Sequence, residues 1–476
     1  MARAGGVVRG GAGWVVRRGG LVVVVLVVVL AGGGVGAGGW WWVRVHDPLS
    51  GVLEGLVGDP VAALDYLAPE GPAQEATTAA SAATGGASVG ADGEAGAAGG
   101  GGVRDGVWVA SGAAVERWGG LSSRGWGSEG LEALAGVGAV VSSLRGSQDP
   151  VVRARALWVS GRVMGLFGGV PVGRFSGEVR RQVAVVVANC APEVVGVALG
   201  RGSGGGLGLG GGLPERQGVV ASVVYRLVED GDAVVTVASG LASVAARGQV
   251  STAGGLEGVY YRVGAVQAFL GAVGSVRGAE LEAGGAGEEE MEGFWGVQHL
   301  GRAVFTTVVG GRGGGAGAEV AAPLVVQEGA TLGGPVAVGG LPGATVADLE
   351  GPTAGSRSLL EAYAYAEAAN GGLVPQEALT RDKFTDVRGE PYSSWYREPG
   401  SGDGPVVDLP AAPSDDVVSE VRGWAGSNSV ANLDEDHVLM DAANAINKGG
   451  NAAAELVLGA DGEPGGDPGD ITINKD

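Results

Sequence analysis

Residues 256–273 read LEGVYYRVGAVQAFLGAV, and this stretch gives the clearest indication of the fold. Its apolar side chains recur every three to four positions, at Leu256, Val259, Tyr260, Val263, Val266, Leu270 and Val273. That spacing places them on one face of an α-helix, which then has to be buried against other elements. Similar apolar faces recur near residues 131–144, 151–167, 178–199 and 219–245. The sequence therefore predicts a mainly α fold, with an irregular α-helical bundle over residues 103–307.

One part of this bundle is similar to a known repeat. Residues 149–157, DPVVRARAL, resemble the start of a HEAT-type repeat helix, and residues 178–181, EVRR, form a faint second copy. No sustained repeat period follows, whereas repeat proteins bury a continuous core by stacking several copies. The expectation is an irregular bundle that is HEAT-like in part.

The segments around the bundle differ from it in composition. Glycine accounts for 98 of the 476 residues, about a fifth against a typical ~7%. Residues 81–102 are rich in glycine and alanine and predict a flexible spacer that sets the bundle away from a membrane, while 308–355 predict a glycine- and proline-rich linker. Residues 44–80 are expected to be a membrane-proximal segment with one short helix. Residues 459–476 carry acids, glycine and proline, which predicts a disordered acidic tail.

The amino-terminal residues predict a membrane segment. Residues 1–18 form a basic segment with four arginines, and residues 19–43 are uncharged and include LVVVVLVVVL at 21–30. As a helix, this stretch is long enough to cross a hydrocarbon core about 30 Å thick. The arginines place the amino terminus in the cytoplasm, with a single pass through the cell membrane and the bulk of the chain extracytoplasmic. The alternative is a signal helix cleaved near Ala37, which would make the protein secreted.

Several classes of function lack the residues that they need. The net charge of −21 argues against a nucleic-acid partner, because an acidic surface repels phosphates. None of the three lysines follows a glycine, as a phosphate-binding P-loop requires. The single cysteine, Cys190, lies in an apolar run and is expected to be a buried structural thiol. The sequence indicates no cofactor.

The carboxyl-terminal part, residues 356–458, predicts a small helical region. Its helices are expected over residues 358–370, 415–425 and 433–447. A capping box opens the first helix, and Asn370-Gly371 would end it. Lys448-Gly449 would end the third helix in the same way.

Four polar side chains crowd the start of that third helix, namely Asp434, Asp436, His437 and Asp441. His437 and Asp441 are spaced i, i+4, so they share a helix face and could ligate a metal together with Asp436. A catalytic site would use His437 with Asp434 and Asp441. The alternative is that these acids stabilise the positive end of the helix dipole.

An aromatic group precedes these helices in an irregular stretch. Tyr392, Trp395 and Tyr396 lie close together in the sequence, beside proline and glycine. Exposed apolar side chains of this kind often form a binding surface, so the three residues are candidates for contact with a partner. The alternative is that they hold the irregular stretch against the helical body.

Together these features predict a membrane-anchored or exported helical protein that acts as a protein-interaction or scaffold component at the cell envelope. Its expected partners are the membrane, through residues 19–43, and another protein. One alternative is an exported hydrolase or toxin-like enzyme with a site within 359–447. Another alternative is a substrate of a secretion system.

Overall fold

The computed structural model describes most of the chain from Pro48 onward. The described residues are 48–70, 102–104, 107–200, 212–311, 356–374, 395–397, 407–410, 413–429, 438–458 and 473–475, with Leu207, Leu209 and Leu379. Within them the chain is mainly helical, as the apolar spacing predicts, and its strands form one short hairpin. The predicted membrane segment at 19–43 lies outside the described residues, and so do most of the two predicted linkers.

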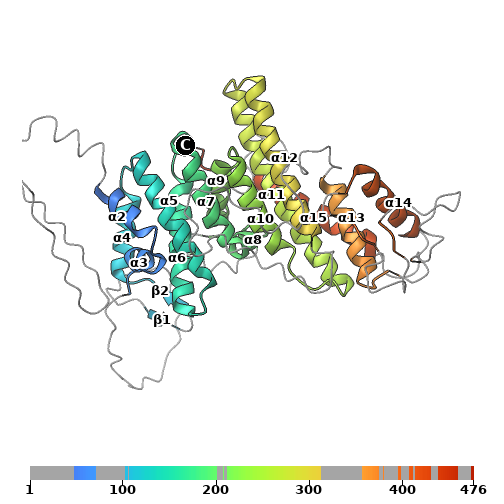
Figure 1. Cartoon of the computed structure of the whole chain (residues 1–476), viewed down its shortest axis with the longest axis horizontal. Coiled ribbons are helices and arrows are strands. Elements are labelled where there is room, and N and C mark those ends of the chain that lie inside the picture. Colours follow the sequence, from blue (N-terminus) through green and yellow to red (C-terminus); the bar gives the residue numbers. More distant parts are fainter. Residues whose placement is uncertain are drawn as a thin grey trace, which may run out of the picture. The chain divides into compact units, whose positions relative to one another are not determined.

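In Figure 1 the helices run broadly in chain order from α2 on the left to α14 on the right, except that α15 lies between α11 and α13. The first half contains α2 (Pro48–Leu56), α3 (Pro60–Leu67), α4 (Gly112–Ser122), α5 (Ser128–Ser143), α6 (Pro150–Gly168), α7 (Gly177–Asn189) and α8 (Ala191–Ala198). The second half contains α9 (Leu213–Leu227), α10 (Gly231–Ala245), α11 (Ala253–Ala283), α12 (Glu288–Gly310), α13 (Ser356–Asn370), α14 (Asp415–Ser429) and α15 (Val438–Leu458). Two 3-10 turns, Leu144–Gly146 and Val172–Arg174, follow α5 and α6.

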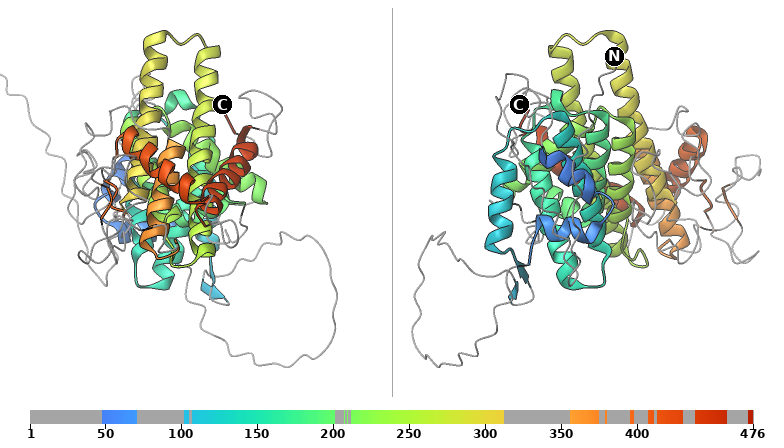
Figure 2. Two further views of the ribbon diagram at one scale, coloured as in Figure 1. Left: turned by 90° about the vertical axis from the view of Figure 1, so that its right-hand side faces the viewer. Right: turned by 60° about the vertical axis from the view of Figure 1, so that its left-hand side comes forward.

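Helix α11 contains the stretch whose spacing predicted the fold. Its N-cap is Thr252, whose hydroxyl accepts a hydrogen bond from the Gly255 amide at 3.1 Å. The predicted apolar side chains are buried, except that Leu270 is partly buried. Figure 2 shows α11 and α12 standing side by side as two long helices. Helix α11 also contacts α8, α9, α10, α13 and α15, so it lies at the centre of the second half.

The larger helices form two rows that pack against each other. In one row, α5 contacts α7, α7 contacts α10, and α10 contacts α12. In the other row, α6 contacts α9, α9 contacts α11, and α11 contacts α15. The rows meet where α5 packs on α6, α7 on α9, and α10 and α12 on α11. Helices α6 and α7, where the HEAT-like sequences lie, begin with the side-chain caps Asp149 and Ser176.

The short helices α2 and α3 belong to this packing. The sequence predicts one membrane-proximal helix here, whereas the structure has two that pack on α5 and bury Leu53, Leu64 and Leu67 completely or almost so. The buried guanidinium of Arg155 on α6 donates to Asp65 at 2.7 Å and to Glu70 at 2.8 Å. The chain divides into two helices because Asp59 caps the start of α3 and Pro60 occupies its first position, where proline is tolerated but a continuous helix is not.

A β-hairpin and helix α4 pack against α6 and the end of α3. Strand β1 (Gly102–Arg104) pairs antiparallel with β2 (Val107–Val109). Trp108 of β2 packs edge-on against Trp158 of α6 at 5.6 Å between ring centroids, and Trp118 of α4 does the same at 6.3 Å. The indole of Trp118 also donates to the Leu67 carbonyl at 3.0 Å. The chain on both sides of the segment 71–101 is therefore attached to the same helical body.

Helix α15 extends beyond its predicted end. It continues through Gly449 and Gly450 to Leu458, because these glycines lie at the crossing with α11 rather than at a helix end. A Cβ on Gly449 would collide with the Tyr261 carbonyl oxygen, and a Cβ on Gly264 would collide with that of Ile446. Glycine on both helices thus allows the two backbones to approach closely. By contrast, the predicted end of α13 at Asn370 is confirmed, and the left-handed glycine is Gly372, at φ +70, two residues beyond it.

The last described residues differ from the predicted disordered tail. Asn474 forms backbone hydrogen bonds with side chains of α9, and Ile473 packs against the core. Ile473 follows a stretch of acids and glycines but is itself apolar, which is why it can be partly buried. The remainder of the tail lies outside the described residues.

Among the described residues, no single helix combines the length and the apolar character that a membrane span requires. Helices α7 and α8 meet that test only as a pair, which is bent by 80°.

Candidate functional site

Of the four polar residues predicted to cluster at the start of α15, the structure describes only Asp441. Asp434, Asp436 and His437 lie outside the described residues, and Asp441 is exposed in the first turn of α15. An acid at this position interacts favourably with the helix dipole. Within the described part of the chain, no three histidine, cysteine or carboxylate side chains gather as metal ligands would. The metal and catalytic roles of this group stay predictions.

The structure describes two of the three aromatic residues predicted to contact a partner, Trp395 and Tyr396. Tyr392 lies outside the described residues, but the Trp395 side chain is 1% exposed and packs 6.3 Å from the ring of Trp424 on α14. Its indole nitrogen donates to Glu420 Oε2 at 2.7 Å. Tyr396 is partly buried and pairs with Val407 in an isolated β-bridge. In this conformation Trp395 holds its segment against α14, and its role in binding a partner stays a prediction.

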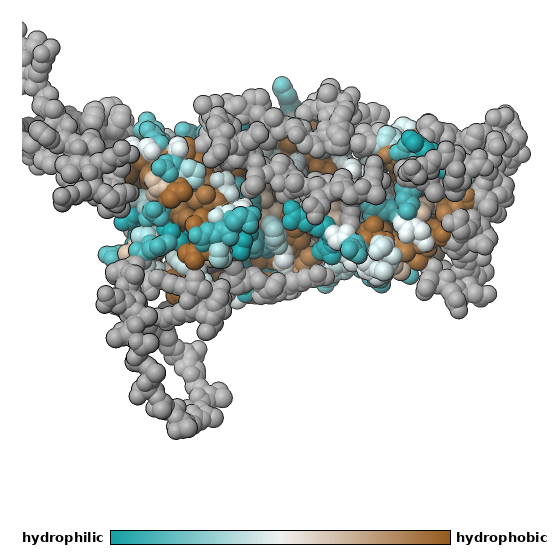
Figure 3. Space-filling view, turned by 60° about the horizontal axis from the view of Figure 1, so that its bottom comes forward, coloured by the Kyte–Doolittle hydropathy of each residue, from teal (hydrophilic) through white to brown (hydrophobic). Residues whose placement is uncertain are grey.

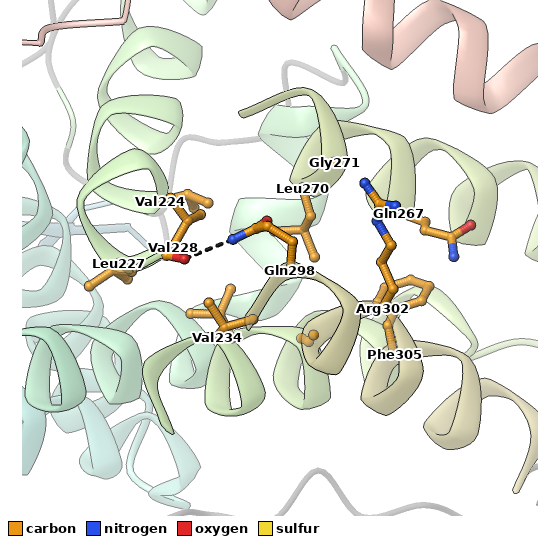
Figure 4. Close-up of a pocket in the computed structure, with 13 residues that line it drawn as sticks. Val224, Leu227, Val228, Val234, Gln267, Leu270, Gly271, Gln298, Arg302 and Phe305 are labelled. Atoms are coloured by element: carbon orange, nitrogen blue, oxygen red, sulfur yellow. Dashed lines mark hydrogen bonds between the residues drawn. The ribbon is translucent and has the colours of Figure 1, made fainter. Parts of the chain in front are cut away.

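Four helices enclose a small apolar pocket, shown in Figure 4. Side chains from α9, α10, α11 and α12 line it, and its volume is about 30 Å³. Gln298 crosses the pocket and donates to the Val228 carbonyl at 2.7 Å. Gln267 Nε2 is buried and has no hydrogen-bond partner among the described residues. A space of this size holds about one or two water molecules, so the pocket is a packing defect rather than a substrate site.

A larger cleft lies where α11 and α15 cross. Its volume is about 370 Å³, and it is bounded by the end of α8, the start of α9 and the facing turns of α11 and α15. Most of the lining is alanine, glycine, leucine and proline, and the polar side chains are Gln217 and Tyr261. Gln217 is buried and already donates to the Val197 carbonyl at 2.9 Å. The cleft therefore offers apolar contact and few polar groups, which suits binding of an apolar side chain or segment.

Buried charged groups elsewhere serve the packing of helices. Both oxygens of the buried Glu361 carboxylate on α13 accept hydrogen bonds, one from Arg357 at 3.1 Å and one from Arg422 on α14 at 2.9 Å. Burial, and secondly the charge of Glu361, raise the pKa of Tyr365 nearby. Between α9, α7 and α11, Glu229 joins Arg180 to Arg277. These ion pairs link neighbouring helices.

Cys190 lies at the bend between α7 and α8 and is completely buried, as the sequence predicts. Burial raises the pKa of its thiol, and the nearby Arg145 charge opposes this only in part. A thiol of raised pKa is a weak nucleophile because little of it is thiolate. Its environment therefore fits a structural residue.

Sequence reasoning did not identify the cleft. Its walls come from helices far apart in the chain, and apolar spacing reveals which residues are buried but not which helices meet. The one local signal was the Gly449-Gly450 pair inside an apolar helix, which also suits a helix end. The buried glutamines Gln217 and Gln298 gave no pattern that could be read from spacing alone.

Exposed apolar side chains concentrate near the amino-terminal end of the described chain. The large ones are Val52, Val61, Val109, Val115 and Met440, and four of these five precede α5. Figure 3 shows hydrophobic side chains among hydrophilic ones on one face of the molecule. Scattered exposed valines are common on protein surfaces, so they do not define a site by themselves.

Comparison with known proteins adds the family. No curated protein and no solved structure matches the chain. A family model does match, over residues 43–457, which spans the described helices from α2 to nearly the end of α15. On this match, the chain belongs to the family of unknown function DUF6571.

Proposed function

We propose that this protein is a membrane-tethered or exported component of the cell envelope that binds a protein partner through its helical body. The observation that supports this most is the packing of the larger helices in two rows. Helix pairs stacked in this way are typical of HEAT-like repeat proteins, whose extended surfaces bind other proteins. The resemblance of residues 149–157 to a HEAT repeat helix points in the same direction.

The cleft between α11 and α15 is the place on this body that best fits a partner's side chain. An apolar anchor residue buried in such a cleft supplies much of the binding energy in many interfaces. The described residues that line the cleft include no carboxylate, histidine or lysine. They are thus suited to holding a segment rather than to transferring a proton.

The proposal can be tested with a substitution that fills the cleft, which should weaken binding of the partner. Ala452 lines the cleft and is exposed, so a larger side chain there does not disturb the core. We expect Ala452→Trp to weaken capture of the envelope partner about tenfold or more, as loss of an anchor contact does. The matched control is Asn451→Trp, one residue earlier, exposed and outside the cleft lining.

Capture is measured by cross-linking and affinity purification from envelope extracts, with the same partner quantified for all three proteins. The proposal is supported if that partner is retained by the control and lost by Ala452→Trp. It is refuted if both variants capture the partner as the unmodified chain does.

Membrane tethering is tested separately by fractionation. The uncharged residues 19–43 support it, and α2 begins directly afterwards at Pro48. We expect the full chain to remain in the membrane pellet after a carbonate wash, and a chain lacking residues 1–47 to be released. Soluble protein that starts near Gly38 would show a cleaved signal instead.

A further inference from the structure

The carboxyl-terminal residues 473–475 lie against α9, beyond the residues that the family model matches. Ser222 and Arg226 of α9 make the polar contacts, and both are buried. Because they are spaced i, i+4, their side chains emerge on the same face of the helix. The contact is therefore built from one helix face and one short segment.

Both backbone groups of a single residue are recognised there. The Asn474 amide donates to Ser222 Oγ at 2.7 Å, and the Asn474 carbonyl accepts from Arg226 Nη1 at 2.6 Å. Two side chains thus replace the pair of hydrogen bonds that a neighbouring β-strand would offer to an extended segment. Such contacts do not depend on the side chain of the recognised residue.

Arg226 is held in place by groups other than the tail. Its side chain is 0% exposed, and it also donates to the Ser222 carbonyl at 2.9 Å and to the Val170 carbonyl. A long side chain fixed in this way loses little further freedom when a ligand binds, which favours affinity. Ile473 packs against the core beside these groups and supplies an apolar contact.

We infer that Ser222 and Arg226 form a peptide-binding site for an extended segment, and that the carboxyl-terminal tail of this chain is its resident, detachable ligand. Ser222, Arg226 and Val170 do not line the cleft between α11 and α15, so this site is independent of the partner cleft proposed above. The tail occupies the site from within the chain, at a high effective concentration. A separate peptide of the same sequence then competes with the tail, so it binds more tightly once the tail is removed.

The experiment uses a chain that lacks residues 471–476 and a fluorescent peptide of residues 470–476, DITINKD. We expect saturable binding by fluorescence anisotropy, and binding to the full chain at least about tenfold weaker, because the tail competes. A peptide N-methylated at Asn474 lacks the amide proton that Ser222 accepts. It should bind about tenfold more weakly, which is the usual effect of one lost hydrogen bond.

The matched protein variants are Ser222→Ala and Ser243→Ala in the shortened chain. Both serines are buried in helices, but the Ser243 hydroxyl donates to the Gly240 carbonyl of its own helix at 2.8 Å. Ser222→Ala should weaken peptide binding, and Ser243→Ala should leave it unchanged. The inference is overturned if the folded, shortened chain does not bind the peptide, or if N-methylation or Ser222→Ala has no effect.

A second measurement keeps the inference testable should the shortened chain fail to fold. A spin label on Lys475→Cys of the full chain reports on the tail selectively, because Lys475 is exposed next to Asn474 and the other cysteine, Cys190, is buried. We expect an immobilised label that becomes mobile when excess peptide DITINKD is added. A label that is mobile without peptide, or one that the peptide does not release, contradicts the inference.

Discussion

Two arginines, Arg155 and Arg226, are buried in the described part of the chain, and their guanidinium groups hydrogen-bond to carboxylates or backbone carbonyls. Arg155 contacts two carboxylates and the Ala68 carbonyl, while Arg226 contacts three backbone carbonyls. A buried charge without such contacts would be strongly destabilising. These environments cannot be predicted from the local sequence, because all partners of Arg155 and Arg226 other than the Ser222 carbonyl lie far along the chain.

Glu193 on α8 should give a pH-dependent stability. Burial raises the pKa of its carboxyl, and Arg145, which forms an ion pair with it, opposes the rise without cancelling it. The folded state therefore holds the proton more tightly than the unfolded state, so the free energy of unfolding falls as the pH rises from the ordinary carboxylate range through the raised pKa. We expect this fall to be smaller in Glu193→Gln, as measured by urea denaturation across that range.

The control for this prediction is Glu257→Gln, an exposed carboxylate on α11. The comparison concerns the slope against pH, since loss of the Arg145 ion pair lowers the stability of Glu193→Gln at any pH. Equal slopes for the unmodified chain and Glu193→Gln would contradict the prediction.

At the scale of the elements, the crossing of α11 and α15 depends on individual glycines. Gly449→Ala should lower the free energy of unfolding by about 1–3 kcal/mol, the usual cost of overpacking, because the new Cβ collides with the Tyr261 carbonyl oxygen. The adjacent Gly450 is the matched control, since a Cβ there would meet Ala268 Cβ at an ordinary 3.7 Å. Gly450→Ala should be neutral, or stabilising by up to about 1 kcal/mol through helix propensity. Thermal and urea unfolding of the two variants measure both effects.

The same glycines show which helix boundaries can be predicted from the sequence and which cannot. Apolar spacing predicted α11 and its buried face, and Asn370-Gly371 predicted the end of α13, because both signals are local. Gly449-Gly450 predicted a helix end wrongly, since a glycine shows that a Cβ is absent but not why. The reason lies in Tyr261 and Gly264 on another helix, a contact between residues far apart in the chain.

At the scale of the whole molecule, residues predicted to be separate segments contribute to one body. The chain from Asp47 to Asp476 forms one compact unit, in which α2 packs on α5 and α15 packs on α11. A fragment of residues 103–307, the predicted bundle alone, would expose the faces that these helices cover. We expect a fragment of residues 48–458 to unfold cooperatively by circular dichroism and calorimetry, and the shorter fragment to unfold at lower temperature with less cooperativity. An equally sharp and stable transition in the shorter fragment would contradict this.

The attachment of both ends of the segment 71–101 has a consequence for engineering. The Pro69 carbonyl accepts from Ser111 at 2.7 Å, and the hairpin that begins at Gly102 packs on α6, so the described residues on either side of the segment are attached to one helical body. The entropic cost of joining two fixed points grows only slowly with the length of the chain between them, by about 0.6 kcal/mol for each doubling. A fluorescent domain or an affinity tag inserted there should therefore be tolerated, which makes this segment the natural place to carry a reporter without disturbing either terminus.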